Sequence, residues 1–170
     1  MSTVMRQLYR VLGIAMSLAL GLAAFAAHAQ ALAVDEPATV CESTVRVDDT
    51  LRFRPDTIEI PSSCRDFTVT LQHVGRLPAV ASPRNWVLVK AGDADAVART
   101  GAAAGQAQGY VDVNDDRVLV ASAVIGRDQS VQVQIPVSQL EPDQAYTYLS
   151  TIPGFSPAMR GTLRIVNGTH

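Results

Sequence analysis

The stretch DFTVTLQHV, residues 66–74, decides the fold class, because its apolar and polar side chains alternate with a period of two. Phe67, Val69 and Leu71 would face one side, and the threonines and glutamine between them would face the other. This alternation is typical of a β-strand with one buried face, whereas a helix would need apolar residues three and four positions apart. We therefore predict a half-buried strand here.

Similar short segments lie on both sides of this strand and are separated by turn residues. Pro55 interrupts one of them, which indicates a bulge or a sheet edge at that point. The run 117–125 is continuously apolar, which predicts a strand covered on both faces. An Ala-rich stretch that ends in glycine, residues 93–105, predicts a helical insertion. About eight such strands predict an all-β Greek-key sandwich; the others are residues 44–48, 51–60, 85–90, 130–135, 145–151 and 161–166.

Residues 1–29 have the organisation of a secretory signal peptide. Arg6 and Arg10 precede an apolar run, and Ala27-His28-Ala29 fits the small-x-small pattern of a cleavage site. The apolar run is about as long as a short membrane span, so a retained anchor is the alternative. We expect cleavage, a periplasmic location, and no membrane contact of the mature chain.

Cleavage would remove 29 of the 170 residues and leave 141, the size of one domain. We expect a flexible lead over residues 30–40, the folded domain over residues 41–166 and a tail over residues 167–170. The loss of two arginines would leave 12 basic against 16 acidic residues, a net charge of −4. Such a chain lacks the basic surface that nucleic-acid binding requires.

The chain has two cysteines, Cys41 and Cys64. In an exported protein, two cysteines predict one disulfide. The alternative, a pair of free thiols or metal ligands, fits less well because a separation of 23 positions matches no compact cysteine motif.

Four stretches together resemble the azurin-like cupredoxins, a family of small exported blue-copper proteins. In order and at matched spacing they are SSCRDFTVTLQHVGRLP (62–78), RNWVL (84–88), NDDRVLVASAVIG (114–126) and TIPGFSPAMRGTL (151–163). The resemblance runs from Cys41 to about Val166. It implies a cupredoxin sandwich of eight strands with a helical flap, and a family role in copper binding and electron transfer.

The resemblance also locates the family's copper ligands, which are two histidines, one cysteine and an axial methionine beside a glycine carbonyl. Carried over by position, the histidines fall on Arg84 and Phe155, the cysteine on Ser150 and the glycine on Pro83. Only the methionine is retained, as Met159. The resemblance therefore implies a degenerate site, with no catalytic residue, no metal and no cofactor expected.

The inventory of residues leads to the same expectation. After cleavage the chain has two histidines, His73 and His170. A site of two histidines and one cysteine would use both of them and would break the only cysteine pair. His73, which matches the family's buried histidine beside the copper, is a weak metal candidate; a hydrogen-bonded core histidine and a pH-linked switch are the alternatives.

The other substituted positions leave alternatives open. Arg84 would be buried against carbonyl or carboxylate groups in place of a metal cation, or would swing out to solvent, or would bind an anion. Met159 would fill the core where the copper was, or meet Cu(I) weakly. Asn85 matches the family residue that joins the site loops, and Trp86 is expected in the core. Ser150 has no nearby base or glycine elbow, so we expect no enzyme.

Phe155 replaces a ligand that lies within an apolar surface patch in the family. An exposed aromatic ring among prolines predicts a protein-docking surface, formed by Ile152, Pro153, Phe155 and Pro157, with Leu77 and Pro78 beside it. The alternative is that the ring turns inward to fill the cavity. We therefore expect a non-redox binding or accessory module, with copper binding or electron transfer through a remodelled site of His73, Met159 and His170 as the alternative.

Overall fold

The computed structural model describes residues 39–77 and 81–167 of the chain. The predicted signal peptide, most of the predicted lead, Pro78 and His170 lie outside the described residues. No helix within the described ranges is long and apolar enough to cross a membrane. The strands are β1 (Glu42–Val47), β2 (Phe53–Arg54), β3 (Thr57–Pro61), β4 (Asp66–His73), β5 (Val87–Lys90), β6 (Val118–Ala121), β7 (Ser130–Pro136), β8 (Tyr146–Leu149) and β9 (Arg160–Val166).

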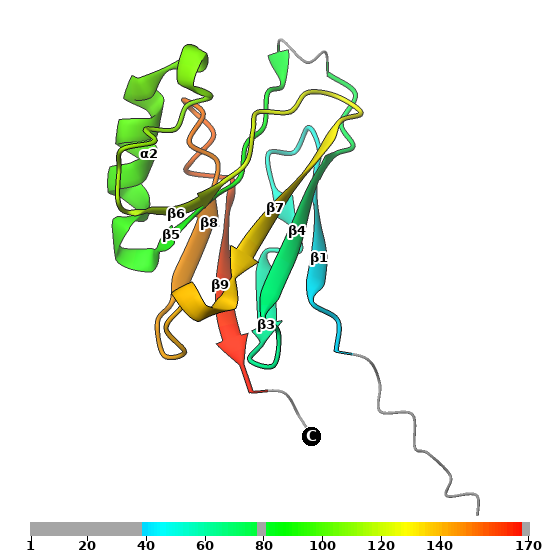
Figure 1. Cartoon of the computed structure of the whole chain (residues 1–170). Helices are drawn as coiled ribbons and strands as arrows, with labels where there is room; N and C mark the ends of the chain where they lie inside the picture. Colours follow the sequence, from blue (N-terminus) through cyan, green and yellow to red (C-terminus); the bar gives the residue numbers. More distant parts are fainter. Residues whose placement is uncertain (1–38, 78–80, 168–170) are drawn as a thin grey trace, which may run out of the picture. The chain divides into compact units, whose positions relative to one another are not determined.

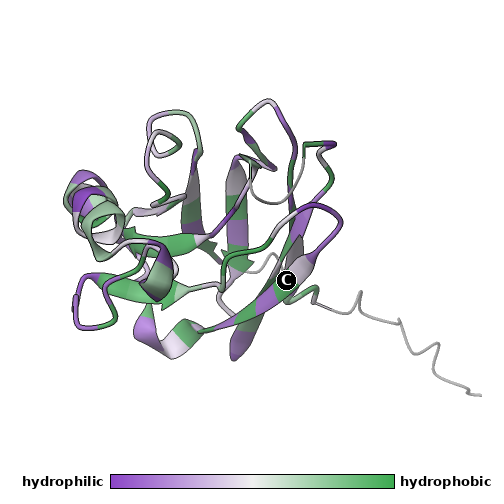
Figure 2. Cartoon of the chain, turned by 90° about the horizontal axis from the view of Figure 1, so that it is seen from above, coloured by the Kyte–Doolittle hydropathy of each residue, from purple (hydrophilic) through white to green (hydrophobic). Residues whose placement is uncertain are grey.

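Two sheets pack face to face and confirm the predicted sandwich (Figure 1). The first has the strand order β2-β1-β4-β7, and the second has the order β3-β9-β8-β5-β6. Alternation along the strands buries one face of each in the core between the sheets. Figure 2 shows this alternation as hydrophobic and hydrophilic segments that succeed one another along the strands. Phe67, Val69 and Leu71 of β4 are all buried, as their pattern predicts.

The segment around Pro55 forms the edges of both sheets. β2 ends before Pro55 and pairs with β1, whereas β3 begins after it and pairs in parallel with β9. Pro55 therefore stands where the chain crosses from one sheet to the other, which confirms the predicted edge. Because this segment is split between the sheets, residues 39–77 and 81–167 form nine strands where about eight were expected.

Helix α2 (Ala94–Ala104) lies against the second sheet and confirms the predicted insertion (Figure 1). Val97 and Ala98 pack with Val87, Val89 and Leu149 in a small second core outside the sandwich. Gly105 ends the helix at a positive φ of 77°, a conformation that glycine adopts readily. Short 3₁₀ turns within residues 81–167 include η2 (Ala91–Asp93), η3 (Gln106–Gln108) and η4 (Val137–Gln139).

The prediction for residues 117–125 is wrong in part. Only Val118–Ala121 form a strand, β6, and all four of its residues are half-buried. β6 lies at the edge of the second sheet, where it pairs with β5 alone. An apolar run cannot distinguish a central strand from an edge strand that a neighbouring helix partly covers, and β6 packs beside the α2 core.

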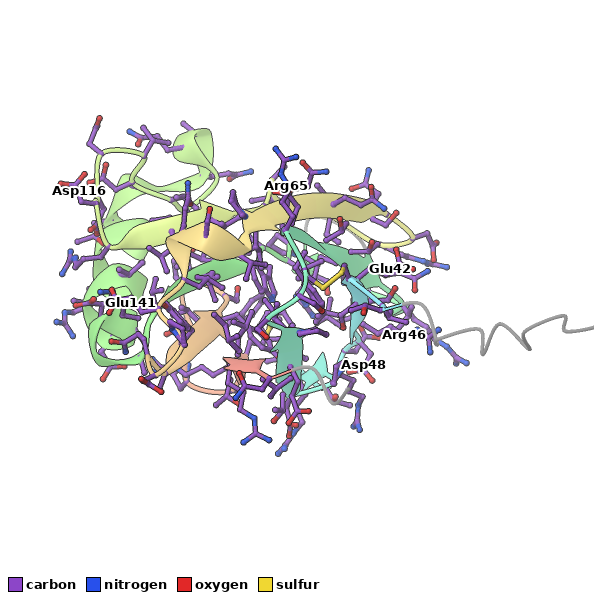
Figure 3. All side chains as sticks on the ribbon, turned by 60° about the horizontal axis from the view of Figure 1, so that its bottom comes forward. Glu42, Arg46, Asp48, Arg65, Asp116 and Glu141 are labelled. Atoms are coloured by element: carbon purple, nitrogen blue, oxygen red, sulfur yellow. A yellow bond between two sulfur atoms is a disulfide. The ribbon has the colours of Figure 1, made fainter. Side chains whose placement is uncertain are left out.

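Cys41 and Cys64 form the predicted disulfide, with their Cα atoms 5.7 Å apart. The bond joins the start of β1 to the turn before β4 and is visible in Figure 3. For a separation of 23 residues, loop-closure entropy contributes about 3.5 kcal/mol to the free energy of unfolding. The disulfide thus stabilises the first sheet and takes up both cysteines of the chain.

Candidate functional site

The residues that the sequence singles out gather at one end of the sandwich, where strands give way to loops. His73 ends β4, Arg84 precedes β5, Ser150 follows β8 and Met159 precedes β9. The side chains of all four are buried. Figure 1 shows the loops after β4, β6 and β8 at this end of the domain. The sheet pairing therefore brings together residues that lie up to 86 positions apart, from His73 to Met159.

Arg84 is completely buried, with 0% of its surface exposed. Its backbone forms a two-way bridge with Ile125, which fixes the residue between two loops. The guanidinium donates from Nη1 to the carbonyl oxygen of Pro83 at 2.9 Å and from Nη2 to that of Asp48 at 3.2 Å. The first of the three alternatives for this residue, burial against carbonyl groups, is therefore the one found in the structure.

The ring of Phe155 covers the Arg84 guanidinium, with Cζ 4.9 Å from the ring centroid. A cation at this distance from an aromatic face is attracted by the ring quadrupole. The Nε atom of Arg84 is buried and has no hydrogen-bond partner. Burial lowers the pKa of Arg84, and the negative charges of Asp49 and Asp48 act in the opposite direction. The site thus holds a desolvated cation that carbonyl oxygens and one aromatic ring compensate.

His73 uses both ring nitrogens in hydrogen bonds. The backbone N–H of Gly75 donates to Nδ1 at 3.0 Å, so Nδ1 carries no proton. The proton of the neutral ring therefore lies on Nε2, which is 3.0 Å from the hydroxyl of Ser82. Burial, followed by the positive charge of Arg84, lowers the pKa of His73 from its ordinary value. This geometry fits a neutral core histidine with no free lone pair.

Ser150 belongs to a polar network centred on Asn85. The Ser150 hydroxyl and the Thr151 N–H donate to Asn85 Oδ1 at 3.0 and 3.1 Å. Asn85 Nδ2 donates in turn to Thr151 Oγ1 and to the carbonyl of Gly109, at 2.8 and 3.1 Å. Asn85 thereby ties the loop after β8 to the loop after α2, as expected. The buried Ser150 hydroxyl faces an amide, which cannot act as a general base.

The loop of residues 150–159 closes on itself through its backbone. Phe155 N–H donates to Ile152, Met159 N–H donates to Phe155, and Ser150 N–H donates to Met159, all at 2.9–3.0 Å. Met159 is fully buried and packs in the main core. Ile152 is buried, Phe155 is half-buried against that core, and Pro153 and Pro157 are exposed. The Phe155 ring is therefore neither fully exposed nor fully turned inward. It covers the Arg84 guanidinium, and the residue remains partly open to solvent.

A shallow groove of about 440 Å³ runs between α2 and this loop. Ala98 and Ala102 of the helix line one side, and Ile152, Pro153 and Pro157 line the other. Leu77, which we expected beside the patch, is 46% exposed. Three of the predicted docking residues thus line a depression of the surface, whereas Phe155 and Leu77 lie outside its lining.

Comparisons with known proteins agree with this fold. Residues 39–166 match the sequence model of the family described as copper binding proteins, plastocyanin/azurin family. This chain belongs to that family. Its relatives include azurin iso-2 of Methylomonas sp. (strain J), 40% identical over 125 residues, which cover 74% of this chain and 97% of that protein. Azurin of Achromobacter denitrificans is 41% identical over 130 residues, 76% of this chain and 87% of that protein.

A solved structure of the Methylomonas sp. strain J azurin gives the same result in three dimensions. It superposes with a TM-score of 0.73 at 39% identity, over 76% of this chain and all of that one. The resemblance read from four stretches of sequence is therefore confirmed at the level of the family and the fold.

In this member of the azurin family, the loop end of the sandwich has few side chains that could act as metal ligands. Both cysteines of the chain are in the disulfide. In the described part of the chain no three His, Cys, Asp or Glu residues converge as metal ligands would. Of the ligand positions that the resemblance locates, Met159 alone carries a soft donor, and its side chain is buried in the main core.

Three residues of the site were missed by sequence reasoning. Ser82 hydrogen-bonds His73, Thr151 hydrogen-bonds Asn85, and Asp49 accepts the backbone N–H of Arg76 at 2.8 Å. No local pattern marks Ser82 or Asp49, because their partners depend on how separate loops meet. Thr151 could have been found, since it directly follows Ser150 in the stretch that resembles the family's copper loop.

Proposed function

We propose that this chain is an exported, periplasmic azurin-fold protein that carries no type 1 copper and acts as a non-redox binding or accessory module. The proposed contact surface is the Phe155 face, which we define as Ile152, Pro153, Phe155 and Pro157. The observation that carries the proposal is the buried Arg84 guanidinium, because its positive charge occupies the position at which the family resemblance puts a copper ligand.

The donor set does not fit type 1 copper. Such a centre needs a thiolate and two imidazole nitrogens with free lone pairs. Both thiols are bridged, Ser150 donates its hydroxyl proton to Asn85, and His73 uses both ring nitrogens. A metal cation beside Arg84 would also be repelled by the buried positive charge of the guanidinium. Arg84 supplies instead a permanent internal cation.

The Phe155 face has the features of a small protein-docking surface. Its aromatic ring is part-exposed but held from below by Arg84, so little side-chain entropy is lost on contact. The two exposed prolines also line the groove along α2, which has alanines beside them and Asp95, Arg99 and Arg160 at charged positions. Aromatic anchors in a rigid apolar setting are typical of interface hot spots. No chemistry on this face resembles an enzyme active site, which supports a binding role.

Copper handling or electron transfer, as the family membership suggests, is the alternative. It would use Met159 with His73 in a remodelled site, after His73 gives up its bond to Gly75. The two functions are distinguished by titrating Cu(I) and Cu(II) into the oxidised protein with residues 1–29 removed, followed by calorimetry and by metal analysis after dialysis. We expect no binding tighter than about 100 µM, a free energy near −5.5 kcal/mol. Stoichiometric binding at micromolar copper would contradict the proposal.

Partner binding is tested separately. The protein would be cross-linked in a periplasmic extract, and Phe155→Ala would be compared with Val113→Ala, which removes an exposed apolar side chain elsewhere. We expect one specific partner that Phe155→Ala loses and the control retains. Equal capture by both variants would contradict a role of the Phe155 face.

A further inference from the structure

We propose that the chain binds a small multivalent oxyanion, with the chemistry of a polyphosphate or dicarboxylate, in a hollow lined by Arg52, Arg54 and Arg160. This arginine hollow has a volume of about 420 Å³, within the range of small-ligand sites. The inference does not depend on the proposed function, because neither Arg52 nor Arg54 belongs to the Phe155 face.

The arginine hollow is built by segments that are distant in the sequence. Arg52 and Arg54 come from the segment that forms β2, whereas Arg160 is the first residue of β9. Phe53, Pro55, Asp56 and Ala158 complete the lining. Three arginines and one aspartate therefore line the hollow, in a chain whose formal net charge is −2. This local excess of positive charge is not a consequence of a generally basic surface.

Two of the three guanidinium groups are available to a ligand. Arg52 and Arg54 form no ion pair with any residue in the described ranges. A guanidinium presents a planar set of N–H donors that matches the oxygens of a phosphate or carboxylate in pairs. Arg160 is held in place by bonds of 2.6 Å to Asp95 and to the carbonyl of Ser156, so its charge stays at the edge of the hollow.

Two positively charged residues that lie opposite each other in the first sheet favour an anion beside the hollow. Arg46 of β1 lies directly opposite Arg54 of β2 in the antiparallel pairing. Like charges in opposite positions destabilise a sheet, and an anion bound between the strands and the hollow would relieve this repulsion. Figure 3 shows Arg46 of β1 well apart from Arg65. The Asp48 carboxylate accepts the N–H and hydroxyl of Thr50, and the charge of Arg54 helps to lower its pKa, so Asp48 offsets part of this repulsion.

The backbone of the hollow is fixed by the core. The hydroxyl of Tyr148 donates to the carbonyl of Pro55 at 2.7 Å, and the N–H of Thr162 donates to the carbonyl of Asp56 at 2.8 Å. Tyr148 is itself fully buried. A floor that is rigid before binding reduces the entropy lost on binding.

The test is a calorimetric titration of inorganic pyrophosphate into the protein with residues 1–29 removed, at ionic strength held constant with NaCl. We expect saturable binding of one pyrophosphate per chain. The double variant Arg52→Gln/Arg54→Gln should weaken it by at least about tenfold, equivalent to 1.4 kcal/mol. Both positions are exposed, so the variant should fold, and circular dichroism would verify this.

The matched control is Arg65→Gln/Arg127→Gln, which removes two charges from exposed arginines outside the hollow. It should leave pyrophosphate binding unchanged within a factor of two or so. Equal weakening by both double variants would show non-specific charge attraction and would overturn the proposal. No binding up to about 10 mM pyrophosphate would overturn it as well.

Discussion

At the scale of single residues, the proposed loss of type 1 copper rests on the buried cation of Arg84. A buried charge costs several kcal/mol unless its surroundings compensate it. Here two carbonyl oxygens and the Phe155 ring do so, while Nε remains without a partner. The ring and the cation should therefore depend on one another for stability.

A double-mutant cycle measures this dependence. Arg84→Met keeps the length of the side chain and removes the charge, and Phe155→Leu keeps an apolar cover and removes the aromatic face. We expect a coupling energy of about 1 kcal/mol between the two positions, measured as free energies of unfolding in urea. Additive effects of the two substitutions would show that the ring does not stabilise the cation.

The lowered pKa of His73 predicts that the free energy of unfolding depends on pH. Its pKa is lowered in the folded protein from the ordinary value of 6.5, so the unfolded chain binds a proton at a higher pH than the folded one. Stability should therefore be highest above pH 6.5 and should fall as the pH drops through 6.5 toward the lowered pKa. The groups that face the ring are Arg84, which lowers the pKa, and Asp49 and Asp128, which raise it.

The measurement is the free energy of unfolding at about pH 7.5 and about pH 5.5, in the parent protein and in His73→Gln. Gln can still bond with Ser82 and Gly75 but does not titrate. The loss of stability at the lower pH should be smaller in the variant. A loss of the same size in both proteins would assign the effect to other groups.

At the scale of elements, the loop after β8 is positioned by helix α2. A Cβ at Gly101 would lie 2.5 Å from the carbonyl oxygen of Tyr110 and 2.8 Å from Cβ of Thr151. Thr151 is the residue that joins Asn85 to Tyr110. Gly101 therefore allows the helix to approach the site loop closely.

Gly101→Ala should destabilise the protein by about 1–3 kcal/mol, because a methyl group has no room between the helix and Thr151. The higher helix propensity of alanine would favour the variant by about 1 kcal/mol, so a net loss identifies the close contact. Gly92→Ala is the control, since nothing lies within 4 Å of its Cβ position. Stabilisation by Gly101→Ala in a thermal melt would contradict this packing.

The sequence predicts the strands better than the site. The alternation in β4 and the glycine-ended Ala-rich stretch of α2 are local patterns, and both elements form where expected. The apolar run 117–125 predicts a strand covered on both faces, but β6 is only half-buried beside the α2 core. How far a helix covers a strand depends on tertiary packing, which a local pattern does not report. For the same reason, the sequence does not decide whether the Arg84 side chain is buried or exposed. Its carbonyl partner on Asp48 is 36 positions away, and no local pattern reports such a contact.

At the scale of the whole molecule, a shared core and one disulfide hold the described domain together. Its main core joins both sheets and includes Met159 and Trp86. The disulfide adds a covalent link between β1 and the turn before β4. Family and fold are thus retained, while the chemistry at the loop end has changed from metal ligands to an internal cation in the account proposed above.

Reduction of the disulfide should lower the free energy of unfolding by about 3 kcal/mol. The measurement compares urea unfolding of the oxidised protein with that of Cys41→Ala/Cys64→Ala, which avoids free thiols. Loop-closure entropy is the physical reason, since the unfolded chain regains the freedom of the segment between the cysteines. A difference below about 1 kcal/mol would mean that residual structure already constrains this segment.

The most direct test of the central claim is the visible absorption spectrum with Cu(II) added, recorded for the parent protein and for Arg84→His/Ser150→Cys/Phe155→His. Circular dichroism would first verify that the variant folds. A thiolate bound to Cu(II) gives an intense charge-transfer band, and the triple substitution supplies the thiolate and the two imidazoles that the family uses. We predict no such band from the parent protein and a blue band with one copper per chain from the variant. An intense band from the parent protein, or a folded variant that stays colourless, would contradict the account.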